Sequence, residues 1–230
     1  MKTRREVIRL LGAMLMKIPL FLGAFGSFVS LSFAKAKRLV LPENTPMSDL
    51  VSRNPAELDT RQLSITPMNE FDVMGQTVYP VDMKQWRLEL SGQMAAQRTF
   101  SYAQLLALPA VERKVLLICP GFFAYHALWK GVSMPALLKS AGMKKETTHI
   151  QFGGPLGINE NTTAYPIEDV LSNKIFLAFQ VNGVPLPERH GFPLRLVAED
   201  HFGDQWTKYI TRVSAVIKTA GPGREELLYL

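Results

Sequence analysis

The strongest constraint on the fold is the apolar run Val115–Ile118, which leads directly into Cys119 and Pro120. Four consecutive apolar residues without polar alternation indicate a strand that is buried on both faces. Proline disfavours helical geometry at the residue before it, so this strand should open into a loop or turn at Cys119. The sequence therefore predicts a thiol at the end of a rigid element, where active-site groups are commonly placed.

Cys119 is the only cysteine among the 230 residues. It cannot form an intramolecular disulfide, so it must be buried, bound to a ligand or reactive. A free cysteine most often acts as a small buried hydrophobe, and the local sequence alone favours that interpretation. A reactive thiol would need exposure and a lowered pKa, which a sequence does not reveal.

Residues 1–36 have the pattern of a twin-arginine signal segment, with Arg4 and Arg5 ahead of a long apolar stretch. We expect export to the periplasm, with cleavage near residue 35 or 37. The alternative is a retained N-terminal membrane anchor, because residues 10–33 are long enough to span a bilayer. This segment holds a net charge of +5 of the chain's +6. The remainder is nearly neutral, so no nucleic-acid partner is expected.

The rest of the chain is long enough for one domain with a sizeable core. We expect an extended N-terminal lead over residues 37–64, the domain over residues 65–218 and an irregular tail over residues 219–230. Short helices among strands of mixed pattern indicate the α+β class. The Asn182-Gly183 pair predicts a tight hairpin turn. Further strands are expected at residues 86–91, 148–152, 175–181 and 208–217, with Leu194, Arg195 and Leu196 alternating, and helices after Ser101, Ser133 and Pro166.

The familiar catalytic motifs are absent from the sequence. The four histidines include no pair at i, i+4 and there is no second cysteine, which argues against a zinc site. The sequence contains no nucleophile elbow, phosphate-binding glycine loop or dinucleotide fingerprint. A hydrolase pair could be assembled from Cys119 and His190, but such pairs meet only in space, so this signal is weak.

Three segments together resemble the molybdopterin-dependent oxidoreductases of the sulfite oxidase fold. The resemblance is closest to the bacterial, twin-arginine-exported branch that includes the catalytic subunit of the periplasmic methionine sulfoxide reductase. It runs from about Asn69 to Val216. The segments are W-x-L-x-L-x-G from Trp86, Cys119 followed by Trp129 and Gly131, and VNGVPLPERHGFPLRLV at residues 181–197.

The resemblance implies that Cys119 ligates molybdenum, because a thiolate is a soft ligand suited to a sulfur-rich site. It also implies that Arg195 and Lys208 hold the phosphate of molybdopterin, since a desolvated phosphate needs cations. The other implied cofactor-binding residues are Asn69, Asp72 and Val73 of an N-terminal loop, Gly154, His190, Trp206 and Thr207.

The chain departs from the family pattern after Cys119, where PGFFAYH replaces more polar runs. No arginine lies between Arg113 and Arg189, which argues against a pocket for anionic sulfite. Phe122, Phe123 and Tyr125 are expected to line an apolar entrance instead. The AED sequence at residues 198–200 also replaces the usual valine-proline-glycine, so the phosphate loop should follow a different path.

We therefore expect an exported, monomeric molybdopterin enzyme that transfers two electrons, with oxygen-atom transfer at a Cys119-ligated molybdenum. A membrane cytochrome or a quinone-linked subunit is the expected redox partner, and the substrate is a small molecule. Two alternatives remain. The first is a non-catalytic binding subunit with the same fold. The second is a thiol enzyme, in which alkylating reagents would label Cys119 rapidly.

Overall fold

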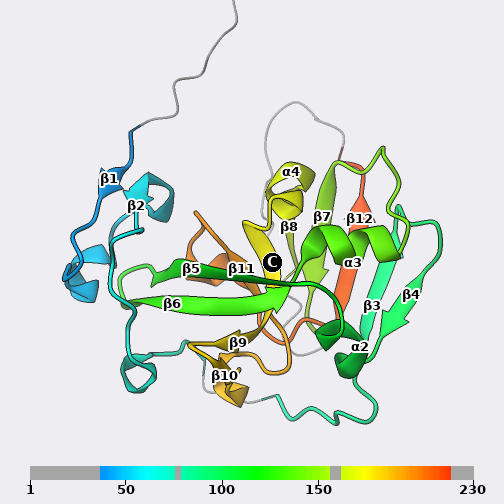
Figure 1. The fold of residues 1–230 in the computed structure, drawn as a ribbon, viewed down its shortest axis with the longest axis horizontal. Helices are drawn as coiled ribbons and strands as arrows, with labels where there is room; N and C mark the ends of the chain where they lie inside the picture. The colour runs from blue at the N-terminus through cyan, green and yellow to red at the C-terminus, as the bar shows by residue number, and fades with distance from the viewer. Residues whose placement is uncertain (1–36, 76–78, 156–161, 219–230) are drawn as a thin grey trace, which may run out of the picture. The chain divides into compact units, whose positions relative to one another are not determined.

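The computed structural model describes residues 37–75, 79–155 and 162–218, which belong to one compact unit, Ala36–Leu230. Two five-stranded sheets form the body of this unit, and a two-stranded sheet lies beside them (Figure 1). The α+β class is confirmed. The signal segment and the C-terminal tail of the sequence analysis lie outside the described residues. Within them, no helix is long and apolar enough to cross a bilayer. The division of the chain at residues 36, 64 and 218 stays a prediction.

The first sheet has the order β10-β9-β6-β5, and β11 pairs with β9. Its longest part is an antiparallel hairpin of two ten-residue strands, in which Cys119 pairs with Phe123 beside the turn. The strands of this sheet are β5 (Ala110–Cys119), β6 (Phe123–Val132), β9 (Ile175–Val181), β10 (Val184–Pro185) and β11 (Arg195–Ala198).

The predicted burial of Val115–Ile118 on both faces is confirmed, and the structure gives its cause. Val115 and Leu117 face the main core, whereas Leu116 and Ile118 belong to a second cluster. That second cluster is formed mainly by the N-terminal segment, with Leu41, Leu50, Leu58 and Leu63. An apolar layer covers each face, so the strand that ends at Cys119 is rigid.

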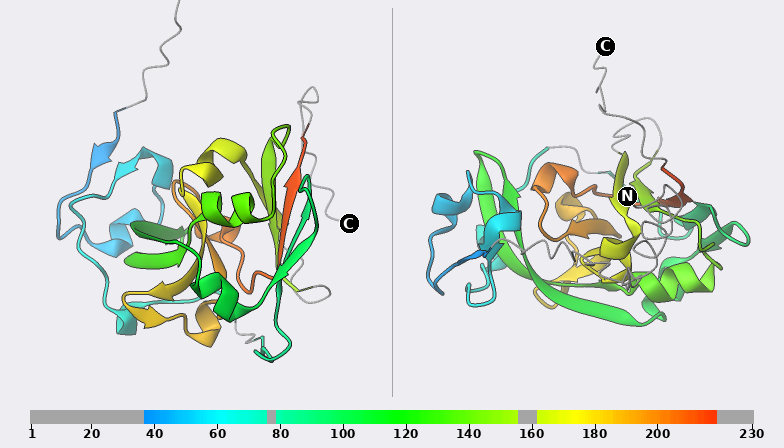
Figure 2. Two further views of the ribbon diagram at one scale, coloured as in Figure 1. Left: turned by 45° about the vertical axis from the view of Figure 1, so that its right-hand side comes forward. Right: turned by 90° about the horizontal axis from the view of Figure 1, so that it is seen from above.

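The N-terminal segment is built of short elements rather than plain extended chain. It lies on the side of β5 and β6 away from the second sheet (Figures 1 and 2). Two residues of β1 remain exposed, while Leu41 after them is buried. The elements are β1 (Leu39–Val40), η1 (Met47–Leu50), η2 (Pro55–Glu57), β2 (Leu58–Asp59), which pairs in parallel with β1, and η3 (Met68–Glu70).

The second sheet has the order β4-β3-β12-β7-β8, with β12 parallel to β3. Helix α3 (Met134–Ser140) and helix α4 (Ile167–Leu171) bury apolar residues in the core, and α2 (Tyr102–Leu106) begins at the predicted capping box of Ser101 and Gln104. The strands are β3 (Leu88–Gly92), β4 (Arg98–Phe100), β7 (His149–Gly153), β8 (Thr162–Pro166) and β12 (Arg212–Val216).

Several details differ from the sequence expectations, which include no strand at the positions of β4 and β8. The sequence pattern predicts no strand over residues 120–128, so it does not identify β6. The final strand begins at Arg212 rather than Lys208, because Tyr209 has a φ of +57° and breaks the extended chain. The alternation expected around Arg195 is wrong, since all four residues of β11 are buried. The Asn182-Gly183 turn is confirmed, with positive φ at both residues.

Gly131, two residues after Trp129, has a structural role in strand β6. The pairing of β6 with β9 shifts register between Lys130 and Gly131, and an added Cβ there would lie 2.2 Å from the Leu177 carbonyl oxygen. The glycine therefore permits a close backbone approach at a bulge.

Replacing Gly131 by alanine is expected to lower the free energy of unfolding by about 2 kcal/mol or more, because strand β9 must move to accept the methyl group. Urea unfolding of the full chain measures this change. Gly183→Asn serves as the control, since nothing lies within 4 Å of an added Cβ there and asparagine tolerates positive φ. Equal stability of Gly131→Ala and the wild type would show that the bulge is not constrained.

Candidate functional site

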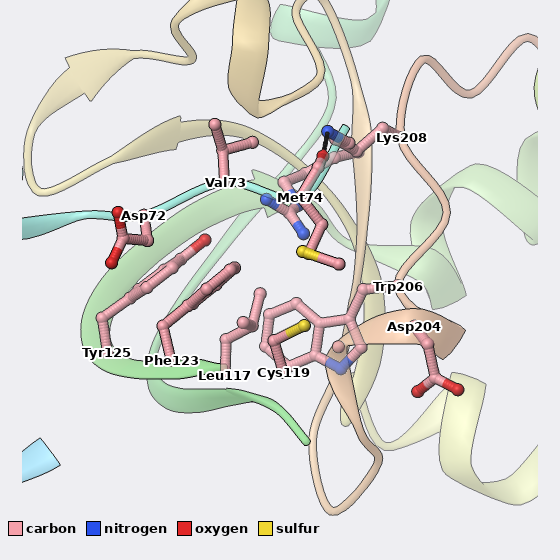
Figure 3. A pocket seen from close by; sticks show the side chains of 12 residues that line it. Asp72, Val73, Met74, Leu117, Cys119, Phe123, Tyr125, Asp204, Trp206 and Lys208 are labelled. Atoms are coloured by element: carbon pink, nitrogen blue, oxygen red, sulfur yellow. Dashed lines mark hydrogen bonds between the residues drawn. The ribbon is translucent and has the colours of Figure 1, made fainter. Parts of the chain in front are cut away.

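A cavity of about 180 Å³ opens where the end of β5 meets the loop after η3 and the chain that follows β11. Its walls come from segments far apart in the sequence, as Figure 3 shows. The lining residues are Asp72, Val73, Met74, Leu117, Cys119, Phe123, Tyr125, Arg195, Gly203, Asp204, Trp206 and Lys208. Cys119, Arg195 and Lys208 thus share one cavity.

Cys119 is 9 % exposed, and its sulfur borders the cavity rather than being sealed in hydrocarbon. The sulfur itself forms no disulfide or hydrogen bond in the described part of the chain. Burial, and then the charge of Asp204, raises the pKa of the thiol. A raised pKa does not favour a free nucleophilic thiolate, whereas a bound metal ion would deprotonate the same sulfur.

Arg195 is a buried cation without an anion. It is 3 % exposed, and its guanidinium carbon lies 5.0 Å from the ring centre of Trp129 and 5.6 Å from that of Trp206. One Nη donates a hydrogen bond to the His190 carbonyl oxygen over 3.2 Å, and the buried Nε has no hydrogen-bond partner among the residues that the structure describes. No carboxylate of the described residues forms an ion pair with it. An unpaired buried charge is costly, so this geometry is suited to an anionic ligand.

Lys208 is the second cation of the cavity. Its Nζ donates to the carbonyl oxygens of Met74, over 2.9 Å, and Arg189, over 3.1 Å. Figure 3 shows the first of these bonds crossing the upper part of the cavity. Burial, together with the charges of Arg195 and Arg189, lowers the pKa of Lys208 to about 8. The two cavity cations repel each other, and a phosphate between them would relieve that repulsion.

Gly191 explains how the two cations come together. Its φ is +104°, which glycine adopts readily, and an added Cβ would lie 3.1 Å from Cβ of both Arg195 and Lys208. A larger residue would be strained there and would press on both side chains. The glycine of the HGFP sequence therefore has a packing role beside the cations.

His190 lies next to Arg195, which donates the hydrogen bond to its carbonyl oxygen. It is 8 % exposed, and its ring makes edge contacts with Phe71 and Tyr125. Its buried Nδ1 has no hydrogen-bond partner in the structure. Burial, followed by the charges of Arg195, Lys208 and Arg189, lowers the pKa of His190 to about 4. The ring is therefore neutral at pH 7.

The remaining sequence-predicted residues divide into two groups. Asp72, Val73 and Trp206 line the cavity with the residues above. Asn69, Gly154 and Thr207 do not line the cavity. Asn69 is exposed on η3, and the Gly154 carbonyl oxygen accepts a hydrogen bond from Arg212 over 3.1 Å. The Thr207 hydroxyl oxygen lies 3.2 Å from the hydroxyl oxygen of Thr163. Trp206 is anchored by an Nε1 hydrogen bond to the His201 carbonyl oxygen.

The aromatic entrance is present in part. Phe123 and Tyr125 line the cavity from β6, with ring planes nearly parallel. Phe122 is 69 % exposed in the turn and does not line it, so that part of the expectation is wrong. A strand prediction for residues 123–132 would have separated the three, because alternate residues share a face.

Sequence reasoning missed four lining residues: Met74, Leu117, Gly203 and Asp204. Leu117 belonged to the predicted strand, and its position two residues before Cys119 places it on the same face. Met74 follows the predicted loop residues directly. Nothing in the sequence marked Asp204, since a lone acidic residue in a polar loop carries no motif.

The AED sequence has a structural role outside the cavity. Glu199 forms an ion pair with Arg113, and Asp200 pairs with Arg38 over 2.6 Å and with Lys174 over 3.3 Å. These contacts fix the chain after β11 to β5 and to the N-terminal segment. In the residues that the structure describes, no group of three or more histidine, cysteine or acidic side chains could hold a metal ion.

The family described as "Oxidoreductase molybdopterin binding domain" matches residues 75–221. The uncharacterized oxidoreductase YuiH of Bacillus subtilis is 32% identical over 122 residues, covering 53% of this chain and 60% of YuiH. The protein-methionine-sulfoxide reductase catalytic subunit MsrP of Gluconobacter oxydans is 28% identical over 153 residues, covering 60% of this chain and 48% of MsrP. The chain thus spans about half of these relatives' lengths.

A solved structure shares the fold. The sulfane dehydrogenase SoxCD from Paracoccus pantotrophus matches with a TM-score of 0.58 at 21% identity. The match covers 89% of this chain and 59% of the SoxCD chain. The sulfite-oxidase-type fold expected from the sequence is confirmed.

The lowered pKa of His190 predicts a specific pH dependence of stability. Unfolded His190 takes up a proton near pH 6.5, whereas folded His190 takes it up near pH 4. Between these values the unfolded state binds more protons, so stability falls as pH falls from about 6.5 to 4, by up to about 3 kcal/mol. His190→Asn should remove this component. Urea unfolding at pH 7 and pH 4.5 tests it, and an equal loss in both proteins would contradict it.

Proposed function

The chain belongs to the oxidoreductase molybdopterin-binding domain family, and on that premise we propose that it is an exported molybdenum oxidoreductase with Cys119 as the metal ligand. The observation that carries the proposal is the shared cavity of Cys119, Arg195 and Lys208. These residues come from the end of one strand, the start of another and a later loop. Their meeting matches the needs of a ligand that has a soft metal at one end and an anion at the other.

The described residues fit this cofactor. A buried Arg195 without a carboxylate and a Lys208 with a lowered pKa form a site for phosphate. The unpartnered Nδ1 of His190 is available for a hydrogen bond to the pterin. Cys119 offers the cavity a thiol. We further assign to the cofactor site Asp72, Val73 and Trp206, which line the cavity, and Asn69, Gly154 and Thr207, which lie outside its lining.

Bound molybdopterin supplies a metal that exchanges two electrons and one oxygen atom with a substrate. Around it, Arg195 and Lys208 would hold and orient the phosphate, and Phe123 and Tyr125 would form an apolar wall of the cavity beside the thiol. The overall reaction balances as substrate oxide plus two electrons and two protons, giving reduced substrate and water, or the reverse. His190 is neutral at pH 7, so it acts as a hydrogen-bond partner rather than as a charged group.

The two-electron reaction needs a donor or an acceptor of electrons. We propose a membrane cytochrome or quinone-linked subunit as that redox partner, and periplasmic localisation through the twin-arginine segment of the sequence. The twin-arginine route carries folded proteins, which suits a cofactor inserted before export.

Metal and pterin analysis tests the assignment of Cys119. The full chain is produced with its export and cofactor-synthesis machinery, and Cys119→Ser is compared with the wild type. We expect pterin to be retained, visible thiolate-to-metal absorbance to be lost and turnover to fall by about 100-fold or more, since the phosphate cations remain while the soft ligand is removed. Unchanged absorbance in Cys119→Ser would rule out the ligand role. Absence of molybdenum, of the visible absorbance and of turnover in the wild type would support the alternative of a non-catalytic binding subunit with the same fold.

Arg195→Gln tests the phosphate site separately. Loss of the buried guanidinium should lower pterin content by about tenfold or more, because a charge-assisted pair is replaced by a neutral side chain. Arg98→Gln is the matched control, since Arg98 is exposed on β4 and outside the cavity. Thermal unfolding of both variants separates cofactor loss from misfolding. Equal pterin content in the two variants would contradict the role of Arg195.

A further inference from the structure

The charges of the cavity are divided between its two ends. Arg195 and Lys208 stand at one end, with Arg189 close enough to act on Lys208. At the thiol end the charged lining residue is Asp204, which lies beside Trp206 (Figure 3). The charge of Asp204 acts on Cys119, since it helps to raise the pKa of the thiol, so an incoming molecule that approaches Cys119 experiences the field of this carboxylate.

The position of Asp204 is fixed by its neighbour. Asp204 is the middle residue of η5 (Gly203–Gln205). An added Cβ at Gly203 would lie 3.0 Å from Leu117 Cδ2 and 3.1 Å from the Ile118 carbonyl oxygen. The glycine thus lets η5 pack directly on the strand that ends at Cys119, and the carboxylate is held at the same end of the cavity as the thiol.

Asp204 also differs from the acidic residues just before it. Glu199 and Asp200 are neutralised by ion pairs with Arg113, Arg38 and Lys174. Across residues 37–75, 79–155 and 162–218, no cation pairs with Asp204 and no hydrogen bond engages its carboxylate. Its negative charge is therefore uncompensated; it is exposed to solvent beside the cavity, and it acts on the Cys119 thiol across the Trp206 side of the cavity.

The cavity wall between Asp204 and the loop of residues 72–74 is apolar and aromatic. Leu117, Phe123, Tyr125 and Trp206 line it, and Asp72 stands at its rim without an ion-pair partner among the described residues. Aromatic faces attract cations and accept apolar groups, whereas they offer nothing to an anion. The charge of Asp204 and the aromatic wall therefore both disfavour an anionic molecule.

We propose that Asp204 and the aromatic wall select substrates by charge, excluding anions and admitting neutral or cationic molecules with an apolar group beside the reacting atom. This inference rests on the proposed function, in which Cys119 marks the reacting end of the cavity. Selection of this kind uses repulsion against the wrong substrate as well as attraction for the right one. The charge of the entrance is a property of this chain's own residues, so it can be measured without the cofactor.

The solitary Cys119 makes that measurement specific. Two methanethiosulfonate reagents of similar size, one with a trimethylammonium group and one with a sulfonate group, report the charge preference at the thiol. Their rate constants are measured on the full chain purified without cofactor, with its fold checked by circular dichroism. Arg195 and Lys208 attract the anionic reagent equally in every variant, so the readout is the change in the ratio of the two rate constants when Asp204 is replaced, and this change should shrink as salt shortens the Debye length from about 10 Å at 0.1 M.

In Asp204→Asn the ratio of the two rate constants should fall by about fivefold at low salt, and in Asp204→Lys the anionic reagent should become the faster one. Glu146→Gln is the matched control, because Glu146 is an exposed carboxylate outside the cavity. An unchanged ratio in Asp204→Asn, or an equal fall in Glu146→Gln, would overturn the proposal. So would a thiol that neither reagent reaches, since a substrate of similar size would then be excluded whatever its charge.

The cofactor-loaded enzyme provides the second arm. Turnover is measured with sulfite, an anion, and with dimethyl sulfoxide, a neutral molecule, as probes. Asp204→Asn should raise kcat/KM for sulfite relative to dimethyl sulfoxide. A loaded protein inactive on both probes, with the reagent preference present, would count against the proposed function while supporting the charge selection.

Discussion

The contact of the Arg195 guanidinium with two indole rings is the interaction on which the site depends. The guanidinium carbon lies 5.0 Å from the ring centre of Trp129 on β6 and 5.6 Å from that of Trp206 after η5. Because Arg195 begins β11, this contact joins three segments of chain around one buried charge. Aromatic faces partly replace the lost hydration of the guanidinium, yet they supply no counter-charge. The protein thus keeps a cation ready for an anion, at a cost to its own stability.

The parts of the fold that depend on local chemistry could be predicted from the sequence. The capping box at Ser101, the Asn182-Gly183 turn and the strand before Cys119 each follow from neighbouring residues. Strand β6 could not be predicted in the same way, because its first residues follow a Pro-Gly turn and mix aromatic, small and polar side chains. Its structure comes from pairing with β5 over its whole length, which is a long-range effect.

The site was predictable in its types of residue and less so in its membership. The resemblance to the molybdopterin oxidoreductases brought Cys119, Arg195 and Lys208 into one hypothesis, and the structure places them around one cavity. The exposure of Phe122 and the inclusion of Asp204 depend on the direction of a turn and on the packing of Gly203 against Leu117. Such tertiary contacts leave no periodic signal in the sequence.

The bond from Lys208 to the Met74 carbonyl oxygen has a consequence for biosynthesis. It joins the early wall of the cavity to a residue near the end of the described chain, and Arg195 is also encoded late. A polypeptide whose synthesis stops after β9 possesses the thiol and the Phe123 and Tyr125 rings but neither cavity cation. Under the proposed function, the anionic end of the cofactor is held only once translation has passed Lys208, so cofactor binding would report that the chain has been made up to the segment before β12.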